Sequence, residues 1–318
     1  MSDDADVRVD AVPRALNGVD AAAAASGAPA FPLPLSTPPR RRASRRHTLA
    51  ILGTAVAATL LAVLAGTSQA STVTAVTRPA VTPPLAQLRS VHDDAAGVLT
   101  RLARTAAAAP PATSTTIDYQ TWNLDLVTDP AQTAAAQFIQ PREVTVARGG
   151  ATVSVVARAG TPFADTGAVV IPASAHPAGQ IIAQYTMEDP VPEPPESSAK
   201  WAAYLARTFG VDASAPAGEI LMQVPTILDS WRLDAAQTSA MLTFLSTAHS
   251  LEVAGSGRDR LGRRGTVLVG PSADGQHQAR ATIEDRTGRV LAVEVVYTGG
   301  TRADLSSPCV TSYTAWRY

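Results

Sequence analysis

Residues 289–297 read Arg-Val-Leu-Ala-Val-Glu-Val-Val-Tyr, and this stretch decides the fold class. Apolar side chains fill one set of alternate positions and most of the other set, which is typical of a strand buried on one face and partly on the other. Two shorter strand-like stretches, residues 266–269 and 278–284, precede it, and turn sequences with Asp and Gly separate the three. We therefore predict an antiparallel meander, followed by a final strand at residues 311–318.

The same two-residue period occurs in the middle of the chain. A strand is predicted from Ile117, because Trp122 and Leu124 would share one of its faces. Residues 143–146 and 152–157 flank a Gly-Gly pair, which allows the positive φ angles of a tight hairpin. This part of the chain is therefore also predicted to be antiparallel sheet.

Helical segments lie before and between these strands. Apolar residues at helical spacing predict a helix of about 20 residues from Leu85. A serine cap and a closing glycine bound a second helix at residues 197–210. Residues 219–231 are predicted to be helical but interrupted by Pro225, and a capping box at Asp234 begins a last helix.

A proline-rich connector precedes the second helix. Residues 188–196 contain four prolines, which deny the backbone both helix continuation and strand hydrogen bonds. The acidic side chains of this segment are compatible with a cation or a basic partner. We favour an extended connector, because the proline spacing does not gather carboxylates around one ion.

The order of strands, helices and strands predicts an α+β fold, with a curved antiparallel sheet and helices packed on one face. The single cysteine, Cys309, excludes an internal disulfide framework and a cysteine-based zinc cluster. It is predicted to be a small buried residue.

The N-terminal part of the chain predicts a membrane anchor. Residues 1–46, which are rich in Ala and Pro and end in five arginines, are expected to be a disordered cytoplasmic tail. Residues 47–69 form an uncharged apolar segment, long enough for a transmembrane helix and preceded by the positive charges of a cytoplasmic flank. Residues 70–84 are then a linker, and residues 85–318 an extracytoplasmic domain. A signal peptide cleaved near Ala70 is the alternative.

Composition and motifs narrow the function. The formal net charge of -1 gives no basic field that would attract nucleic acid. The sequence contains no Gly-x-Ser-x-Gly motif, and its histidines are not at the helical spacing of metal ligands, so we predict neither an enzyme nor a metal or other cofactor. The glycines of residues 255–257 are predicted to form a turn, because no P-loop lysine follows them.

Two sets of candidate binding residues follow from the sequence. One basic cluster in the outer domain is a candidate contact for an anionic ligand or a lipid head group: Arg258, Arg260, Arg263 and Arg264. Large apolar residues of the predicted helices are candidates to line a ligand cavity: Trp201, Phe209, Met222 and Met241. Solvent-exposed turn residues and ordinary core packing, respectively, are the alternatives.

Residues 259–267, Asp-Arg-Leu-Gly-Arg-Arg-Gly-Thr-Val, and residues 285–291, Asp-Arg-Thr-Gly-Arg-Val-Leu, complete a pattern that begins with the apolar N-terminal segment. In its order of elements the chain resembles an uncharacterised actinobacterial family of single-pass membrane proteins, often encoded beside extracytoplasmic-function sigma factors. The resemblance implies a membrane topology and a regulatory setting, but no catalytic residues.

These observations lead to three functional hypotheses. The first is a membrane-tethered extracytoplasmic binding or sensing module in envelope-stress or sigma-factor-linked regulation, with a regulatory protein as partner. The second is a carrier of a lipid or other amphiphile in a cavity between sheet and helices. The third is an extracytoplasmic hydrolase, which would require Ser, His and Asp to converge from distant positions.

Overall fold

The computed structural model of the chain describes residues 82–91, 93–110, 114–124, 140–149, 152–161, 176–188, 191–302 and 305–318. The predicted cytoplasmic tail, the predicted membrane segment and most of the predicted linker lie outside these residues. Within them, no helix is both long and apolar enough to cross a membrane.

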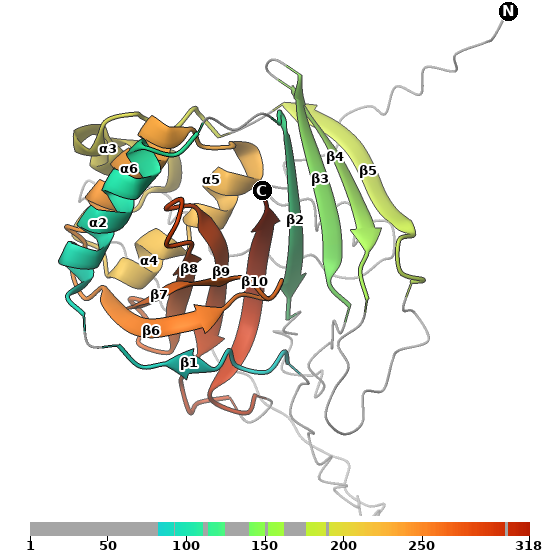
Figure 1. Ribbon diagram of the computed structural model, residues 1–318. Helices are drawn as coiled ribbons and strands as arrows, with labels where there is room; N and C mark the ends of the chain where they lie inside the picture. Colours follow the sequence, from blue (N-terminus) through green and yellow to red (C-terminus); the bar gives the residue numbers. More distant parts are fainter. Residues whose placement is uncertain are drawn as a thin grey trace, which may run out of the picture.

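Ten strands form one antiparallel sheet in the order β1-β6-β7-β8-β9-β10-β2-β3-β4-β5 (Figure 1). The strands are β1 Leu88–Arg89, β2 Thr116–Asn123, β3 Arg142–Gly149, β4 Thr152–Ala159, β5 Ile181–Glu188, β6 Glu252–Arg258, β7 Arg264–Pro271, β8 His277–Ile283, β9 Val290–Tyr297 and β10 Cys309–Arg317. The helices are α2 Ala95–Ala107, α3 Ser198–Phe209, α4 Ala217–Leu221, α5 Val224–Ser230 and α6 Ala235–Leu245. The α+β prediction is confirmed.

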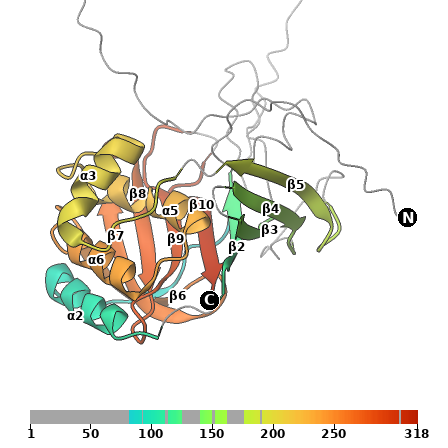
Figure 2. The same cartoon turned by 90° about the horizontal axis from the view of Figure 1, so that it is seen from above.

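The sheet curves around the helices. Strands β6 to β10 bend about the helical layer, whereas β3, β4 and β5 stand to the side of it and are called the wing below (Figures 1 and 2). Helix α4 packs on β7 and β8, α5 packs on β2, and α6 lies against both α2 and α3. Strand β2 therefore lies at the junction where the helix-covered strands meet the wing.

The two faces of the sheet bury different cores. Tyr119 and Trp316 belong to the main core between sheet and helices. Trp122 and Tyr313 lie in a smaller cluster on the opposite face, with ring centroids 6.4 Å apart. This division follows from the alternation of side chains along β2 and β10. Cys309 is buried in the smaller cluster, as predicted.

The helix predicted from Leu85 begins ten residues later. Asp94 accepts a hydrogen bond from the backbone N–H of Gly97 at 2.7 Å and caps α2 at Ala95. The preceding residues include β1, which pairs with β6, while Leu85 packs against the smaller cluster. The apolar residues of this stretch thus divide between the segment that contains β1 and helix α2, although their spacing fits one continuous helix.

The turn predicted at residues 255–257 is also wrong, because these residues lie within β6. Gly255 has a φ of 140° and sits at an irregularity in the pairing of β6 with β7. A Cβ atom at this position would lie 2.2 Å from the carbonyl oxygen of Arg89. The glycine is therefore required for the close approach of β1 to β6.

The helix caps follow the sequence closely. Helix α3 is preceded by Ser197 and ends at Gly210, which has a φ of 70°. Asp234 and Gln237 form the capping box of α6. The predicted helix at residues 219–231 is two short helices, with Pro225 in the first turn of α5.

The described part of the proline-rich connector, residues 191–196, contains neither helix nor strand, and it is attached to the helices. The carbonyl oxygen of Val191 accepts a hydrogen bond from Trp231 Nε1, and that of Pro192 accepts one from the Tyr204 hydroxyl. Further along, the carbonyl oxygen of Pro195 accepts one from Trp201 Nε1. These side-chain donors replace the backbone partners that the prolines exclude.

Candidate functional site

A surface groove of about 590 Å³ lies where the start of α2, the end of α6 and the start of β6 meet. The apolar part of its wall contains Val91, Ala95, Ala96, Leu245, Ala248, Leu251 and Val253. Leu245 and Leu251 belong to the main core, so part of the groove wall is formed by core residues. Its volume falls within the range of roughly 300–1,000 Å³ that is usual for small-ligand sites.

Three carboxylates line the same groove. Asp93 and Asp94 precede α2, and Glu252 is the first residue of β6. Asp94 is fixed by its capping bond to Gly97, whereas the side chains of Asp93 and Glu252 are exposed. None of the described residues that line the groove is Lys, Arg or His.

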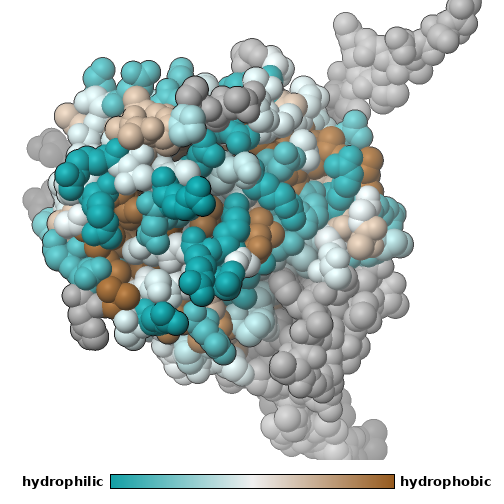
Figure 3. All heavy atoms as spheres, in the orientation of Figure 1, coloured by the Kyte–Doolittle hydropathy of each residue, from teal (hydrophilic) through white to brown (hydrophobic). Residues whose placement is uncertain are grey.

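The formal charge of the described residues that line the groove is negative. The N-terminus of α2 contributes roughly half a positive charge, which is smaller than the formal charge of the three carboxylates. Hydrophobic and hydrophilic residues lie side by side over this region of the surface (Figure 3). The groove is therefore suited to a ligand with a cationic group and an apolar part.

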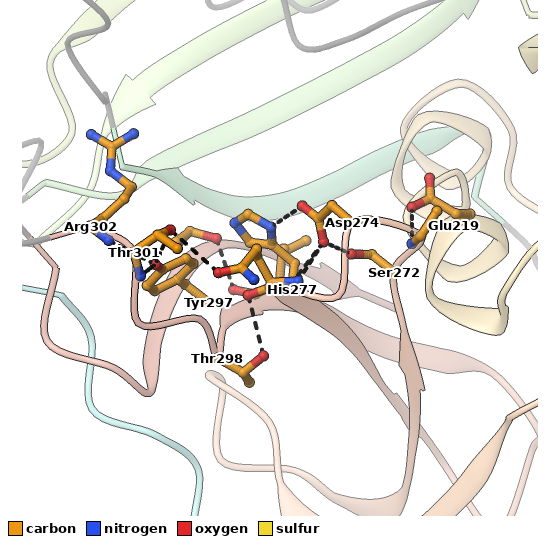
Figure 4. Close-up of polar contacts among 12 residues, drawn as sticks. Glu219, Ser272, Asp274, His277, Tyr297, Thr298, Thr301 and Arg302 are labelled. Carbon is orange, nitrogen blue, oxygen red and sulfur yellow. Dashed lines mark hydrogen bonds and ion pairs between the residues drawn. The ribbon is translucent and has the colours of Figure 1, made fainter. Parts of the chain in front are cut away.

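A second polar cluster lies at the turn between β7 and β8 (Figure 4). Asp274 accepts hydrogen bonds from the backbone N–H groups of Gln276 and His277 and from the Ser272 hydroxyl. Its other carboxylate oxygen lies 2.7 Å from His277 Nδ1. Burial alone would raise the pKa of the Asp274 carboxyl, but these hydrogen bonds and His277 outweigh it and hold the pKa well below its ordinary value.

Tyr297 connects this turn to the chain after β9. Its hydroxyl oxygen lies 3.1 Å from Thr301 Oγ1 and accepts hydrogen bonds from the backbone N–H groups of Thr301 and Arg302. The Thr301 hydroxyl, followed by these two N–H groups, lowers the pKa of Tyr297. The ring of His277 meets that of Tyr297 edge-on at 5.3 Å between centroids.

The cluster fixes backbone and does not activate a nucleophile. Ser272 donates to Asp274, and His277 uses its Nδ1 for the same carboxylate. Glu219 of α4 accepts a hydrogen bond from the backbone N–H of Ala273, which ties the turn to the helical layer. Tyr297 is only 2% exposed, so its phenol is not presented to a substrate.

The four arginines of the predicted anionic site do not converge on one point. Arg260 pairs with Glu294 at 2.6 Å and donates to the carbonyl oxygen of Pro84, and Arg263 pairs with Asp259. Arg258 donates to the carbonyl oxygen of Gly262 within its own turn, and Arg264 is exposed. Two of the four charges are thus already neutralised within the domain.

The four predicted cavity residues lie in or against the main core. Trp201 and Met241 are buried, and the ring of Trp201 stacks on Phe244 at 6.5 Å. Phe209 and Met222 are partly buried and pack against the same cluster. None of the four lines the groove.

The groove residues escaped the sequence analysis, because Asp93 and Asp94 were assigned to a helix face and Glu252 to no element. The acidic pair before an apolar helical run is a capping signal, and it is the one feature that points to this position. Among the residues that the structure describes, no three His, Cys, Asp or Glu side chains are grouped to hold a metal ion. Comparisons with family models, curated proteins and solved structures find no match to this chain.

Proposed function

We propose that residues 82–318 form an extracytoplasmic binding module that is tethered by residues 47–69 and binds a cationic amphiphile. The observation that carries the proposal is the groove between α2, α6 and β6, which combines an apolar wall with three carboxylates. It keeps the binding and sensing role of the first sequence hypothesis and takes the ligand class from the second. The ligand lies at the surface, not in a cavity lined by Trp201 and Met241.

The wall and the carboxylates have different roles in this proposal. Contact with Ala248 and Val253, which are partly exposed, removes apolar ligand surface from water at about 25 cal/mol per Å². Asp93 and Glu252 select for positive charge. Since both side chains are exposed, each contributes only about 0.2–1 kcal/mol to binding.

The tether gives the binding event a route to the cytoplasm. A ligand in the groove contacts the residues directly before α2, which continue toward the predicted membrane segment. We propose that occupancy of the groove is communicated through this segment to a regulatory protein on the inner side, in keeping with the family that the sequence resembles.

Titration calorimetry of residues 82–318 tests the ligand class. The probes are decylammonium and decyl sulfate, which have equal chains and opposite charges, both below their micellar concentrations. We expect decylammonium to bind and decyl sulfate to bind at least tenfold more weakly. Changing Asp93→Asn together with Glu252→Gln should weaken decylammonium binding by roughly three- to tenfold.

The control variant is Asp285→Asn, which removes an exposed carboxylate at the turn between β8 and β9. It should leave decylammonium binding unchanged, and circular dichroism should show all variants folded. Equal binding of the two probes, or equal effects of the groove and control substitutions, would refute the proposed site.

A further inference from the structure

Strand β5 forms one edge of the ten-stranded sheet, at the outer border of the wing (Figure 1). It pairs with β4 on one side and, among the described strands, with none on the other. The opposite edge of the sheet is β1, which has only two residues. Because an edge strand presents a row of backbone N–H and C=O groups, β5 is the long edge at which another strand can add.

Strand β5 lacks the features that usually protect an edge against pairing. Its sequence, Ile-Ile-Ala-Gln-Tyr-Thr-Met-Glu, contains no Pro, Lys or Arg, and its single charged residue, Glu188, is the last. The one irregularity in its pairing with β4 lies at its start. There Ile181 is 49% exposed, and among the described residues only one other large apolar side chain is exposed. Natural edge strands usually carry charges, prolines or bulges, so this edge is suited to pairing.

The direction of the backbone groups in β4 is fixed by the end of that strand. The N–H of Ala159 donates to the carbonyl oxygen of Gln180 at 2.9 Å, and the carbonyl oxygen of Ala159 accepts from the N–H of Gly179 at 2.7 Å. Ala159 therefore bonds toward the β5 side. In an antiparallel ladder alternate residues of a strand bond to the same neighbour, so the odd-numbered residues of β4 bond to β5.

The outward groups of β5 follow from this alternation. Val155 of β4 lies opposite Tyr185 of β5, so the backbone groups of Tyr185 bond to β4. The backbone N–H and C=O groups of Gln184 and Thr186, on either side of it, consequently point away from β4. They are placed to bond to a further strand.

We propose that β5 pairs with β5 of a second copy of this chain, antiparallel about a two-fold axis at Tyr185. Residues 182–188 of the two copies then overlap, and the outward groups of Gln184 bond to those of Thr186 in the second copy. The two Tyr185 side chains meet on the axis as a non-hydrogen-bonded pair, where opposing side chains are closest and aromatic pairs stabilise a sheet. Since each copy has one such edge, the contact closes at two copies.

The charges near the edge support this register. Glu188 of one copy comes opposite the first residues of β5 in the other, so the two Glu188 carboxylates lie at opposite ends of the contact. Arg158 of β4 lies beside Ile181 at that end, two strand spacings of about 4.8 Å from Glu188 of the second copy. Arg158 forms no ion pair with another described residue, and Glu143, opposite it in β3, is engaged by Arg317. The arrangement thus brings opposite charges together at both ends.

Disulfide trapping in the full-length protein, kept in a mild detergent, tests the register. Tyr185→Cys places two thiols on the axis, where the Cα atoms are about 4.5 Å apart and a disulfide can form. Gln184→Cys is the matched control, because its two copies lie about 8–9 Å apart, beyond the reach of a disulfide. Cys309 is buried and common to both proteins. Tyr185→Cys should oxidise to a covalent dimer at least tenfold faster, and equal rates would overturn the proposal.

A mixture of two variants tests the same register with both tyrosines kept. Gln184→Cys and Thr186→Cys come opposite each other across the axis, with Cα atoms about 5.5 Å apart. The mixture should form mixed disulfides at least tenfold faster than either variant forms dimers alone. A mixture that oxidises no faster than its components would contradict the pairing of Gln184 with Thr186.

A proline tests the strand pairing itself. Gln184→Pro removes an N–H group that points away from β4, so it leaves the bonds between β4 and β5 in place. Added to Tyr185→Cys, it should slow trapping at least tenfold, whereas Gln184→Ala, which keeps the N–H, should not. Circular dichroism should show each variant folded. Undiminished trapping with the proline, or equal slowing by both changes, would overturn the proposal. The contact uses none of the groove residues, so its outcome is independent of decylammonium binding.

Discussion

Replacing Asp229 by Asn should remove the pH dependence of stability that this one carboxyl gives to the domain. Its pKa is raised from 3.8 in an exposed state to about 7 in the fold. Between these values the folded protein binds a proton that the unfolded chain has released, so stability falls as the pH rises. The contribution is fully present below pH 3.8 and is lost above pH 7.

The magnitude follows from the size of the shift. At about 1.4 kcal/mol per pKa unit, a shift of this size corresponds to roughly 4 kcal/mol over the whole range. About 2 kcal/mol of this falls between pH 5 and pH 7. Asparagine has no proton to lose, and its amide can accept from Trp316 while donating to Tyr119. The variant should therefore be the more stable protein at pH 8.

Urea denaturation of residues 82–318 at half-unit steps from pH 5 to pH 8 measures the effect. The useful quantity is the difference in unfolding free energy between Asp229→Asn and the unmodified protein, because the histidines contribute equally to both. This difference should rise by roughly 3 kcal/mol in favour of the variant. A difference that stays constant within about 1 kcal/mol would show that the carboxyl does not titrate in this range.

Three other predictions test the fold, the turn and the topology. Gly255→Ala should cost roughly 3 kcal/mol of unfolding free energy, because its Cβ meets the carbonyl oxygen of Arg89, while Gly275→Ala at an open turn should cost about 1 kcal/mol; similar losses in urea denaturation would contradict the close approach. Asp274→Asn should cost about 1 kcal/mol at pH 7 through its lost pairing with His277, and this cost should shrink below about pH 4, where the unfolded chain takes up a proton on this carboxyl that the native carboxylate, with its lowered pKa, does not; a cost that does not depend on pH in thermal unfolding would argue against the pair. A periplasmic-type phosphatase fused after residue 84 should be active and one fused after residue 46 inactive, and the opposite result would refute the orientation.

The C-terminal strands were predictable because their own residues carry the apolar pattern that identifies a strand. Residues 290–297 bury both faces, so the apolar pattern of β9 is enough to identify a strand whatever its neighbours are. The capping box at Asp234 is likewise local, since both of its partners lie within four residues. Predictions succeeded where sequence neighbours supply the stabilising contacts.

The boundary of α2 and the strand character of β6 depend on distant residues. Leu88 pairs with Gly257, and this pairing removes the first turns of the helix that periodicity alone favours. Gly255 in β6 is explained by its distance to Arg89, which no local pattern contains. Tertiary pairing overrides local propensity at both places.

The candidate sites were hidden for a related reason. Asp229 lies near the end of a short helix, and by spacing alone it is an ordinary exposed acid. Its character comes from Trp316, 87 positions later, and from Tyr119 on the neighbouring strand, which both form hydrogen bonds with the carboxyl. The arginines at residues 258–264 show the converse: grouped in sequence, they are separated in space by pairing with Glu294 and Asp259. The environment of a charged side chain whose partners are all distant in sequence therefore cannot be inferred from its neighbours along the chain. For Asp229, it is the packing of α5 against β2 and β10 that places the carboxyl beside Trp316 and Tyr119.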